Sequence, residues 1–275
     1  MTNPSGFPDA LDAAPVSIDP PADGHARYRL TLAYDGTGFR GFAPNAGVRT
    51  VGGELSEALE KVLGTRIDLA VAGRTDSGVH ARGQVVSFDA PNGTVEPGEL
   101  HRSLNSLLGP SVVVREVQPA AADFHARFSA RWRRYRYRLL TAEVPDPFLA
   151  STTWWMPKAL DHHRMADAAH LLAGTHDFSS FCRRPKDRPD ASLVRHVTDA
   201  RWSQEPGDDG RVLTFEITAT AFCHQMIRSV VGTLVEVGRG VRDVDAVADA
   251  LAGADRSLAG QLAPPCGLIL WEVGY

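Results

Sequence analysis

The chain has 275 residues, of which 43% are hydrophobic and 23% charged, and its formal net charge is −4. These values are ordinary for a globular protein and leave room for one large domain or two smaller ones. No apolar run approaches the roughly 18 residues that a membrane-spanning helix needs, and the first residues lack the basic-then-apolar order of a signal peptide. We therefore expect a cytoplasmic protein that does not span a membrane.

The N-terminal segment 1–26 is rich in Pro, Ala and Asp and contains neither Lys nor Arg. Such a composition buries too little apolar surface to fold, so we expect a disordered acidic tail. An α+β half at 27–125 follows it. Its expected elements are a strand at 28–34, a helix at 51–63, strands at 67–72 and 84–89, a helix at 97–107 and a strand at 112–117.

The C-terminal half, 126–275, repeats this βαββαβ order. Its expected elements are a strand at 133–140, a helix at 161–172, strands at 193–202 and 211–220 joined by a turn at 206–210, a helix at 224–237 and a strand at 268–273. Segments 174–192 and 240–267 show no simple element and are expected to be functional loops. The predicted fold is α+β, with two βαββαβ (ferredoxin-like) halves, mainly antiparallel sheets flanked by helices and a central active-site cleft.

The cysteines and histidines give no sign of a metal centre. Cys182, Cys223 and Cys266 are odd in number and widely separated, which suggests neither a disulfide framework nor a metal site. The histidines at 162, 163 and 170 lack the carboxylate or thiol set that would complete a site, so we expect them at the surface. We predict no metal and no cofactor.

One predicted loop stands out. In it Asp76 lies two residues after Arg74, the pair is bounded by Gly73 and Gly78, and an apolar run lies on each side. An isolated pair of this kind would form only a weak surface ion pair. The whole string Gly-Arg-Thr-Asp-Ser-Gly-Val-His-Ala at 73–81, followed by Gly-Gln-Val-Val-Ser-Phe at 83–88, closely resembles the catalytic loop of the TruA-type tRNA pseudouridine synthases. Further matches are Tyr-Asp-Gly-Thr-Gly at 34–38, Gly-Thr-His-Asp-Phe at 174–178 and Ala-Pro-Pro-Cys-Gly-Leu at 263–268.

The resemblance covers roughly 27–275 and implies an enzyme that isomerises uridine to pseudouridine in tRNA without a cofactor. It implies positions 38, 39 and 40 of the anticodon arm as targets and a homodimer as the active form. The chain departs from the family pattern at Gly41-Phe42-Ala43-Pro44-Asn45, where the family usually has Gly-Trp-Gln-x-Gln, and at Gln225, where a second histidine is common. The first departure leaves the RNA contacts of that loop open.

Four residues carry the implied chemistry. Asp76 is the candidate catalytic carboxylate, which we expect to act either as nucleophile at C1′ or as base at C2′ of the ribose. By resemblance, Arg228 in His-Gln-Met-Ile-Arg is its counter-charge, and a guanidinium beside a desolvated carboxylate keeps it ionised. The resemblance also implies that Tyr135 is the aromatic that stacks on the base, a contact that contributes roughly 1–3 kcal/mol. Arg74 faces the RNA, where a planar guanidinium can fill the space left by an extruded base.

Arginines crowd the strand that carries Tyr135. Six of them, with no acid among them, lie between Arg127 and Arg138. This positive stripe suits phosphate contacts, although charge on an edge strand also prevents aggregation. On a strand, Tyr135 and Tyr137 share one face and the arginines at 134, 136 and 138 the other, and we expect Tyr137 in the core.

Two other functions fit part of the sequence. A glycoside hydrolase would use similar sugar chemistry but needs a second carboxylate, and Asp68 and Asp89 belong to the flanking strands. A non-catalytic RNA-binding module would account for the arginine–aromatic strand, but in it Asp76 would only repel phosphate. Assays for released base and for altered uridine separate the three possibilities.

Overall fold

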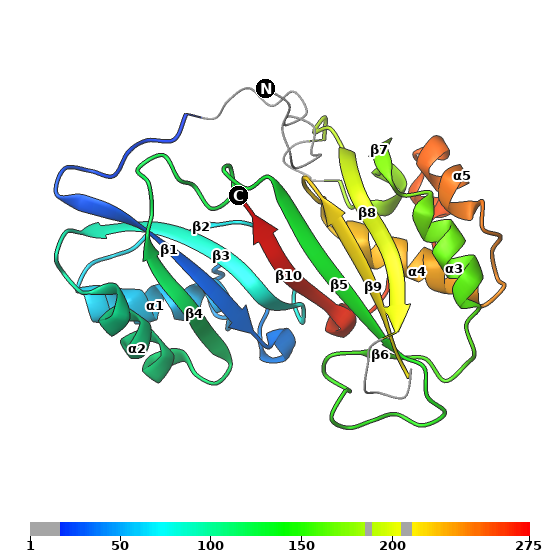
Figure 1. Cartoon of the computed structure of the whole chain (residues 1–275), viewed down its shortest axis with the longest axis horizontal. Coiled ribbons are helices and arrows are strands. Elements are labelled where there is room, and N and C mark those ends of the chain that lie inside the picture. The colour runs from blue at the N-terminus through cyan, green and yellow to red at the C-terminus, as the bar shows by residue number, and fades with distance from the viewer. Residues whose placement is uncertain (1–16, 185–188, 205–210) are drawn as a thin grey trace. The chain divides into compact units, whose positions relative to one another are not determined.

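A computed structural model describes residues 17–184, 189–204 and 211–275. The chain folds into two compact units, one containing Trp132–Leu268 and the other running to Arg131 and taking in Ile269–Tyr275. Each unit has a mostly antiparallel sheet with helices packed beside it (Figure 1). Most of the predicted tail and the turn at 206–210 lie outside the described residues.

The unit that ends at Arg131 has strand order β4-β1-β3, with β2 antiparallel and β10 parallel to β3. Its helices α1 and α2 pack against each other. The elements are β1 (His25–Tyr34), the 3-10 turn η1 (Gly36–Gly38), α1 (Val51–Leu63), β2 (Ala70–Val71), β3 (His80–Pro91), α2 (Pro97–Leu108), β4 (Val112–Pro119) and β10 (Leu268–Gly274).

Local sequence patterns account for this unit. Along β1, alternate residues from Tyr28 to Tyr34 are buried, as expected for a strand with one face in the core. Helix α1 begins after Thr50, whose hydroxyl accepts a hydrogen bond from the Gly53 N–H, and it ends at Gly64 with φ 71°. Buried leucines of α1 and α2 complete the core. They are Leu55, Leu59, Leu63, Leu100, Leu104 and Leu108.

The unit containing Trp132–Leu268 has strand order β5-β9-β8-β7, all antiparallel, with β6 parallel to β5. Helices α3 and α5 both pack against α4 beside this sheet (Figure 1). The elements are β5 (Trp132–Leu140), β6 (Trp154–Trp155), α3 (His162–His170), β7 (Gly174–Asp177), η2 (Ser179–Phe181), β8 (Val194–Gln204), β9 (Val212–Ala219), α4 (Met226–Gly238), α5 (Ala246–Gly253), η3 (Arg256–Leu258) and η4 (Pro265–Gly267).

Helix α4 is the centre of this second core. Its residues from Val230 to Val235 are all buried. Gly232 has no side chain because a Cβ there would overlap the carbonyl oxygen of Gln261. The segment that follows, up to Ala263, therefore lies directly against the helix, and the Ala263 N–H donates to the Arg228 carbonyl at 3.1 Å.

The α+β fold with mainly antiparallel sheets and flanking helices is confirmed. The ferredoxin-like description of the two halves and the central cleft stay predictions. The expected lack of elements in 174–192 and 240–267 is wrong, because those segments contain β7 and α5. β7 is held by pairing with β8, a contact that the short segment's own pattern does not reveal.

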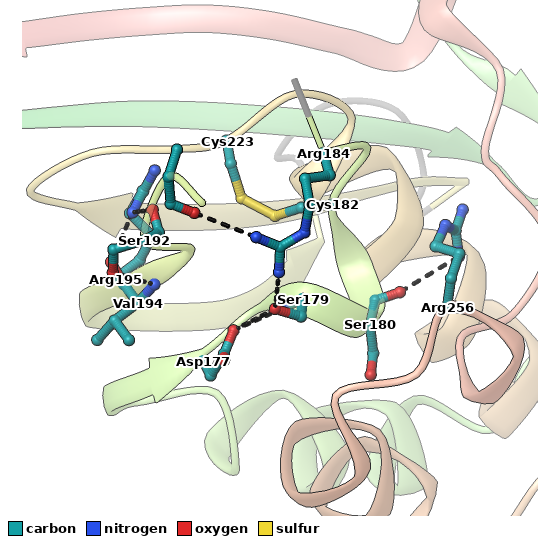
Figure 2. Close-up of a disulfide and its surroundings, with 11 residues drawn as sticks. Asp177, Ser179, Ser180, Cys182, Arg184, Ser192, Val194, Arg195, Cys223 and Arg256 are labelled. Carbon is teal, nitrogen blue, oxygen red and sulfur yellow. Dashed lines mark hydrogen bonds between the residues drawn. A yellow bond between two sulfur atoms is a disulfide. The ribbon is translucent and has the colours of Figure 1, made fainter. Parts of the chain in front are cut away.

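Two of the cysteines are joined, against expectation. Cys182, directly after η2, and Cys223, just before α4, form a disulfide with Cα atoms 5.9 Å apart (Figure 2). The two residues are 41 positions apart in sequence, so their spacing carried no sign of the bond. Next to it, the Arg183 N–H donates to the His224 carbonyl at 2.9 Å. The expectation that the cysteines form no disulfide is therefore wrong for this pair, and Cys266 is free.

The described residues contain no helix long and apolar enough to cross a membrane. The histidines at 162, 163 and 170 are exposed on α3, as expected.

Candidate active site

The loop that contains the family-like string, called the signature loop (residues 73–79), connects β2 to β3 in the unit that ends at Arg131. Arg74 is exposed, Asp76 is half-buried, and Thr75 between them is buried. The Val79 N–H donates to the Asp76 carbonyl at 3.1 Å, which turns the chain back toward β3. Gly78 has φ 78°, a left-handed conformation that favours glycine. The loop is thus closed by a local backbone hydrogen bond and carries one exposed and one half-buried charged residue.

A buried polar cluster lies beneath the loop. The Tyr34 hydroxyl, at the end of β1, lies 2.8 Å from the Thr75 hydroxyl. The Gln84 carboxamide, on β3, donates to the Tyr34 hydroxyl at 3.2 Å and to the Gly73 carbonyl at 2.7 Å. Burial raises the pKa of the Tyr34 hydroxyl to about 12, so it stays protonated and can donate at neutral pH. These groups were not among the site residues predicted from sequence.

The segment after η1 packs on the same loop. The Phe42 N–H donates to the Thr75 carbonyl at 3.1 Å, and the Ser77 hydroxyl donates to the Phe39 carbonyl at 3.3 Å. Gly41 has φ 96°, and a Cβ there would lie 2.9 Å from the Thr75 oxygen. The loop that departs from the family pattern therefore begins with a glycine that the close approach requires.

In the other unit, Tyr135 projects from β5 with 8% of its surface exposed. Its ring meets the Phe222 ring edge-on, with centroids 5.0 Å apart. Tyr137, two residues on, is fully buried and donates from its hydroxyl to the Pro264 carbonyl at 2.8 Å, which confirms the expectation that it belongs to the core. Tyr135 is thus the more accessible of the two tyrosines on this face.

Arg228 lies in the first turn of α4 and is half-buried. Its Nε donates to the Ala263 carbonyl at 2.7 Å, while its own carbonyl accepts from the Ala263 N–H. The guanidinium is therefore attached to the segment that leads to Cys266, whose thiol donates to the Thr153 carbonyl at 3.4 Å. Burial raises the pKa of this thiol, so it stays protonated near neutral pH.

The arginine stripe has an acidic partner that sequence reasoning missed. Glu216, on β9 opposite Arg136, is buried, and it pairs with Arg136 at 2.8 Å and with Arg201 from β8. Its Oε1 lies 3.9 Å from Arg134 Nε. A lone glutamate in the otherwise uncharged strand Val-Leu-Thr-Phe-Glu-Ile-Thr-Ala is the sequence signal for it. The positive charge of the stripe is therefore partly balanced.

The structure brings Arg74 and Asp76 together on one loop of one unit, and places Tyr135 and Arg228 in the other. Such a chain has the features of an α+β enzyme with a glycine-bounded aspartate loop.

The sequence pattern described as tRNA pseudouridine synthase matches residues 31–129 and 168–275. The chain therefore belongs to the tRNA pseudouridine synthase family, a family of isomerases, and the resemblance seen in the sequence is confirmed. Tyr135 lies between the two matched stretches.

Individual proteins named tRNA pseudouridine synthase A are similar in sequence to this chain along most of their length. The protein named tRNA pseudouridine synthase A from Geobacillus kaustophilus is 41% identical over 250 residues, which are 90% of this chain and 94% of the relative. The protein of the same name from Streptomyces griseus is 40% identical over 259 residues, 92% of this chain and 89% of the relative. A solved Cbf5-Nop10-Gar1 complex aligns at 15% identity over 76% of this chain and 45% of that chain, with a TM-score of 0.31.

Proposed function

We propose that the protein isomerises uridine to pseudouridine in tRNA, at positions 38, 39 and 40 of the anticodon arm, with Asp76 as the catalytic carboxylate and no cofactor. The observation that supports this is a half-buried aspartate on a loop whose neighbouring residues are hydrogen-bonded to buried groups. A carboxylate that must meet one carbon of a ribose gains from such preorganisation. Family membership supports the tRNA substrate.

The reaction breaks the bond between N1 of the base and C1′ of the ribose and then joins C5 to C1′. The base loses the proton on C5 and gains one on N1, so the product is an isomer and the step needs no redox partner. Asp76 starts it by one of two routes. It forms an ester at C1′ and releases the base, or it removes the C2′ proton so that the base leaves by elimination. In the first route C5 then displaces the carboxylate from C1′, and in the second C5 adds to C1′ while Asp76 returns the proton to C2′, so either route ends with C5 bonded to C1′ and Asp76 free.

The other predicted residues have supporting roles in this proposal. Arg228 is the counter-charge that keeps Asp76 ionised, and its half-buried guanidinium with one N–H committed to a carbonyl suits a fixed charge. Tyr135 stacks on the detached uracil and holds it while it turns. Arg74, exposed beside Asp76, contacts the RNA where the nucleotide leaves its stack.

We further propose that the arginines of β5 contact tRNA phosphates and that the active form is a cytoplasmic homodimer. Arg134, Arg136 and Arg138 alternate with the buried tyrosines, so they share one face of the strand. Each keeps part of its surface exposed although Glu216 balances some of their charge. Such a face suits a protein that recognises the shape and backbone of tRNAs of varied sequence.

The test is to incubate the purified protein with an unmodified tRNA transcript and to map pseudouridine by position. Wild type should form it at positions 38–40, and Asp76→Asn should form none while binding tRNA normally. Asp68→Asn, which neutralises an exposed aspartate upstream of β2, is the matched control and should retain activity. Pseudouridine formation by Asp76→Asn would refute the assignment. Release of free uracil would favour a hydrolase, and unaltered uridine with tighter binding by Asp76→Ala would favour a binding module.

A further inference from the structure

The signature loop is anchored by hydrogen bonds at three positions, 73, 75 and 77. The Gly73 carbonyl accepts from the buried Gln84 carboxamide, the buried Thr75 side chain meets Tyr34, and the Ser77 hydroxyl bonds to the Phe39 carbonyl. The residues between them, at positions 74 and 76, are the exposed arginine and the half-buried aspartate. These anchors lie on both sides of Arg74 and of Asp76, so the backbone that carries the two charged residues is held by its immediate neighbours.

The strongest anchors form a single buried chain of hydrogen bonds. Tyr34 is 5% exposed, Thr75 6% and Gln84 0%. Gln84 uses its side-chain oxygen for the Val85 N–H, and its two amide hydrogens go to the Gly73 carbonyl and the Tyr34 hydroxyl. The Tyr34 hydroxyl accepts from Gln84 and shares a second hydrogen bond with the Thr75 hydroxyl, in which either oxygen can donate. The chain of hydrogen bonds extends from β3 through β1 to the residue before Asp76.

We infer that Tyr34, Thr75 and Gln84 are positioning residues for the reaction and set where the Asp76 carboxylate meets the ribose. This inference rests on the proposed function. The three groups connect β1, β3 and the loop, so the loop backbone is held in place by hydrogen bonds to two paired strands of the sheet. Low exposure makes each bond costly to leave unmade, because no water is available to replace a lost partner. The arrangement therefore limits the conformational freedom of the loop backbone, which its glycines would otherwise increase.

The expected signature is a loss of rate without a loss of binding. Tyr34→Phe keeps the ring and removes only the hydroxyl, which leaves the Gln84 amide and the Thr75 hydroxyl without their shared partner. A small displacement of a catalytic group can lower the rate by about 100-fold. Because the proposed phosphate contacts are made by the arginines of β5 and not by these buried groups, kcat should fall by roughly 10- to 100-fold while KM stays within about 2-fold.

A matched pair at position 75 separates the hydrogen bond from the shape of the side chain. Thr75→Val is nearly isosteric and lacks the hydroxyl, so it should lose rate as Tyr34→Phe does. Thr75→Ser keeps the hydroxyl and should restore most of kcat. Tyr275→Phe is the control, because it removes another tyrosine hydroxyl, bonded to the Ala126 carbonyl at 2.7 Å, in the same unit. It should keep wild-type kcat even if it lowers the Tm.

Steady-state kinetics of pseudouridine formation and the Tm of each variant complete the experiment. The inference is supported if Tyr34→Phe and Thr75→Val lower kcat alone and Thr75→Ser recovers it. It is overturned if these variants keep wild-type kcat, if KM rises in step with the loss, or if Tyr275→Phe loses as much rate. A wild-type protein that forms no pseudouridine would instead refute the proposed function itself, so the two failures are distinguishable.

Discussion

The disulfide between Cys182 and Cys223 allows a stability prediction whose size follows from the loop that it closes. The cysteines are 41 residues apart. In the chain-entropy account, a cross-link over a loop of that length stabilises the folded state by about 4 kcal/mol, because it restricts the unfolded chain. The bond also fixes the segment before α4, where Phe222 contacts Tyr135. Reduction should therefore weaken this unit substantially.

For a protein of this size, 1 kcal/mol corresponds to roughly 2–4 °C in Tm, so loss of the bond should lower the Tm by about 8–16 °C. The assay is thermal unfolding with and without dithiothreitol, in a Cys266→Ser background that removes the remaining thiol. The double variant Cys182→Ser, Cys223→Ser should match the reduced protein in either buffer. Alkylation of the free thiols shows whether the disulfide is fully reduced. If it is, and the Tm is nevertheless unchanged, the loop-closure reasoning is refuted.

Three further outcomes can be checked. Gly232→Ala should destabilise the protein by about 1–3 kcal/mol, because its Cβ meets a backbone carbonyl, whereas Gly98→Ala, with no atom nearer than 3.9 Å, should be neutral or stabilising in denaturant unfolding. Tyr135→Phe should retain most pseudouridine formation and Tyr135→Ala should lose it; equal losses would exclude stacking as the main role. Burial, with Arg27 and Arg127 nearby, lowers the pKa of His125 below its ordinary 6.5, so the unfolded chain binds this proton more readily. The stability that this histidine contributes should be present above pH 6.5 and lost below it, and a His125→Asn variant should show a weaker acid dependence.

Local patterns in the sequence predicted most elements because their causes are local. The alternation along 28–34 and the helical spacing of 51–63 each correspond to one buried face of one element. Pro97 at the start of α2 and Gly64 after α1 are likewise signals read from a few neighbouring residues. The signature string at 73–81 indicated the family directly, and the family match confirmed it.

Short or weakly patterned segments were predicted less well. The strand expected at 67–72 is reduced to Ala70–Val71, and β3 begins at His80, inside the signature string. The helix expected to stop before Gly238 includes it. In each case the boundary depends on pairing or packing with a distant segment, which one segment's composition does not contain.

The amino-acid sequence by itself determined the class of fold, the order of its main elements and the identity of the aspartate loop, since each is encoded in residues that are neighbours along the chain. Tertiary structure alone decided that Cys182 meets Cys223, that Glu216 balances the arginines of β5, and that Tyr34 and Gln84 support Thr75. These contacts join residues far apart in sequence. Only folding creates the low exposure that makes such hydrogen bonds and ion pairs costly to break.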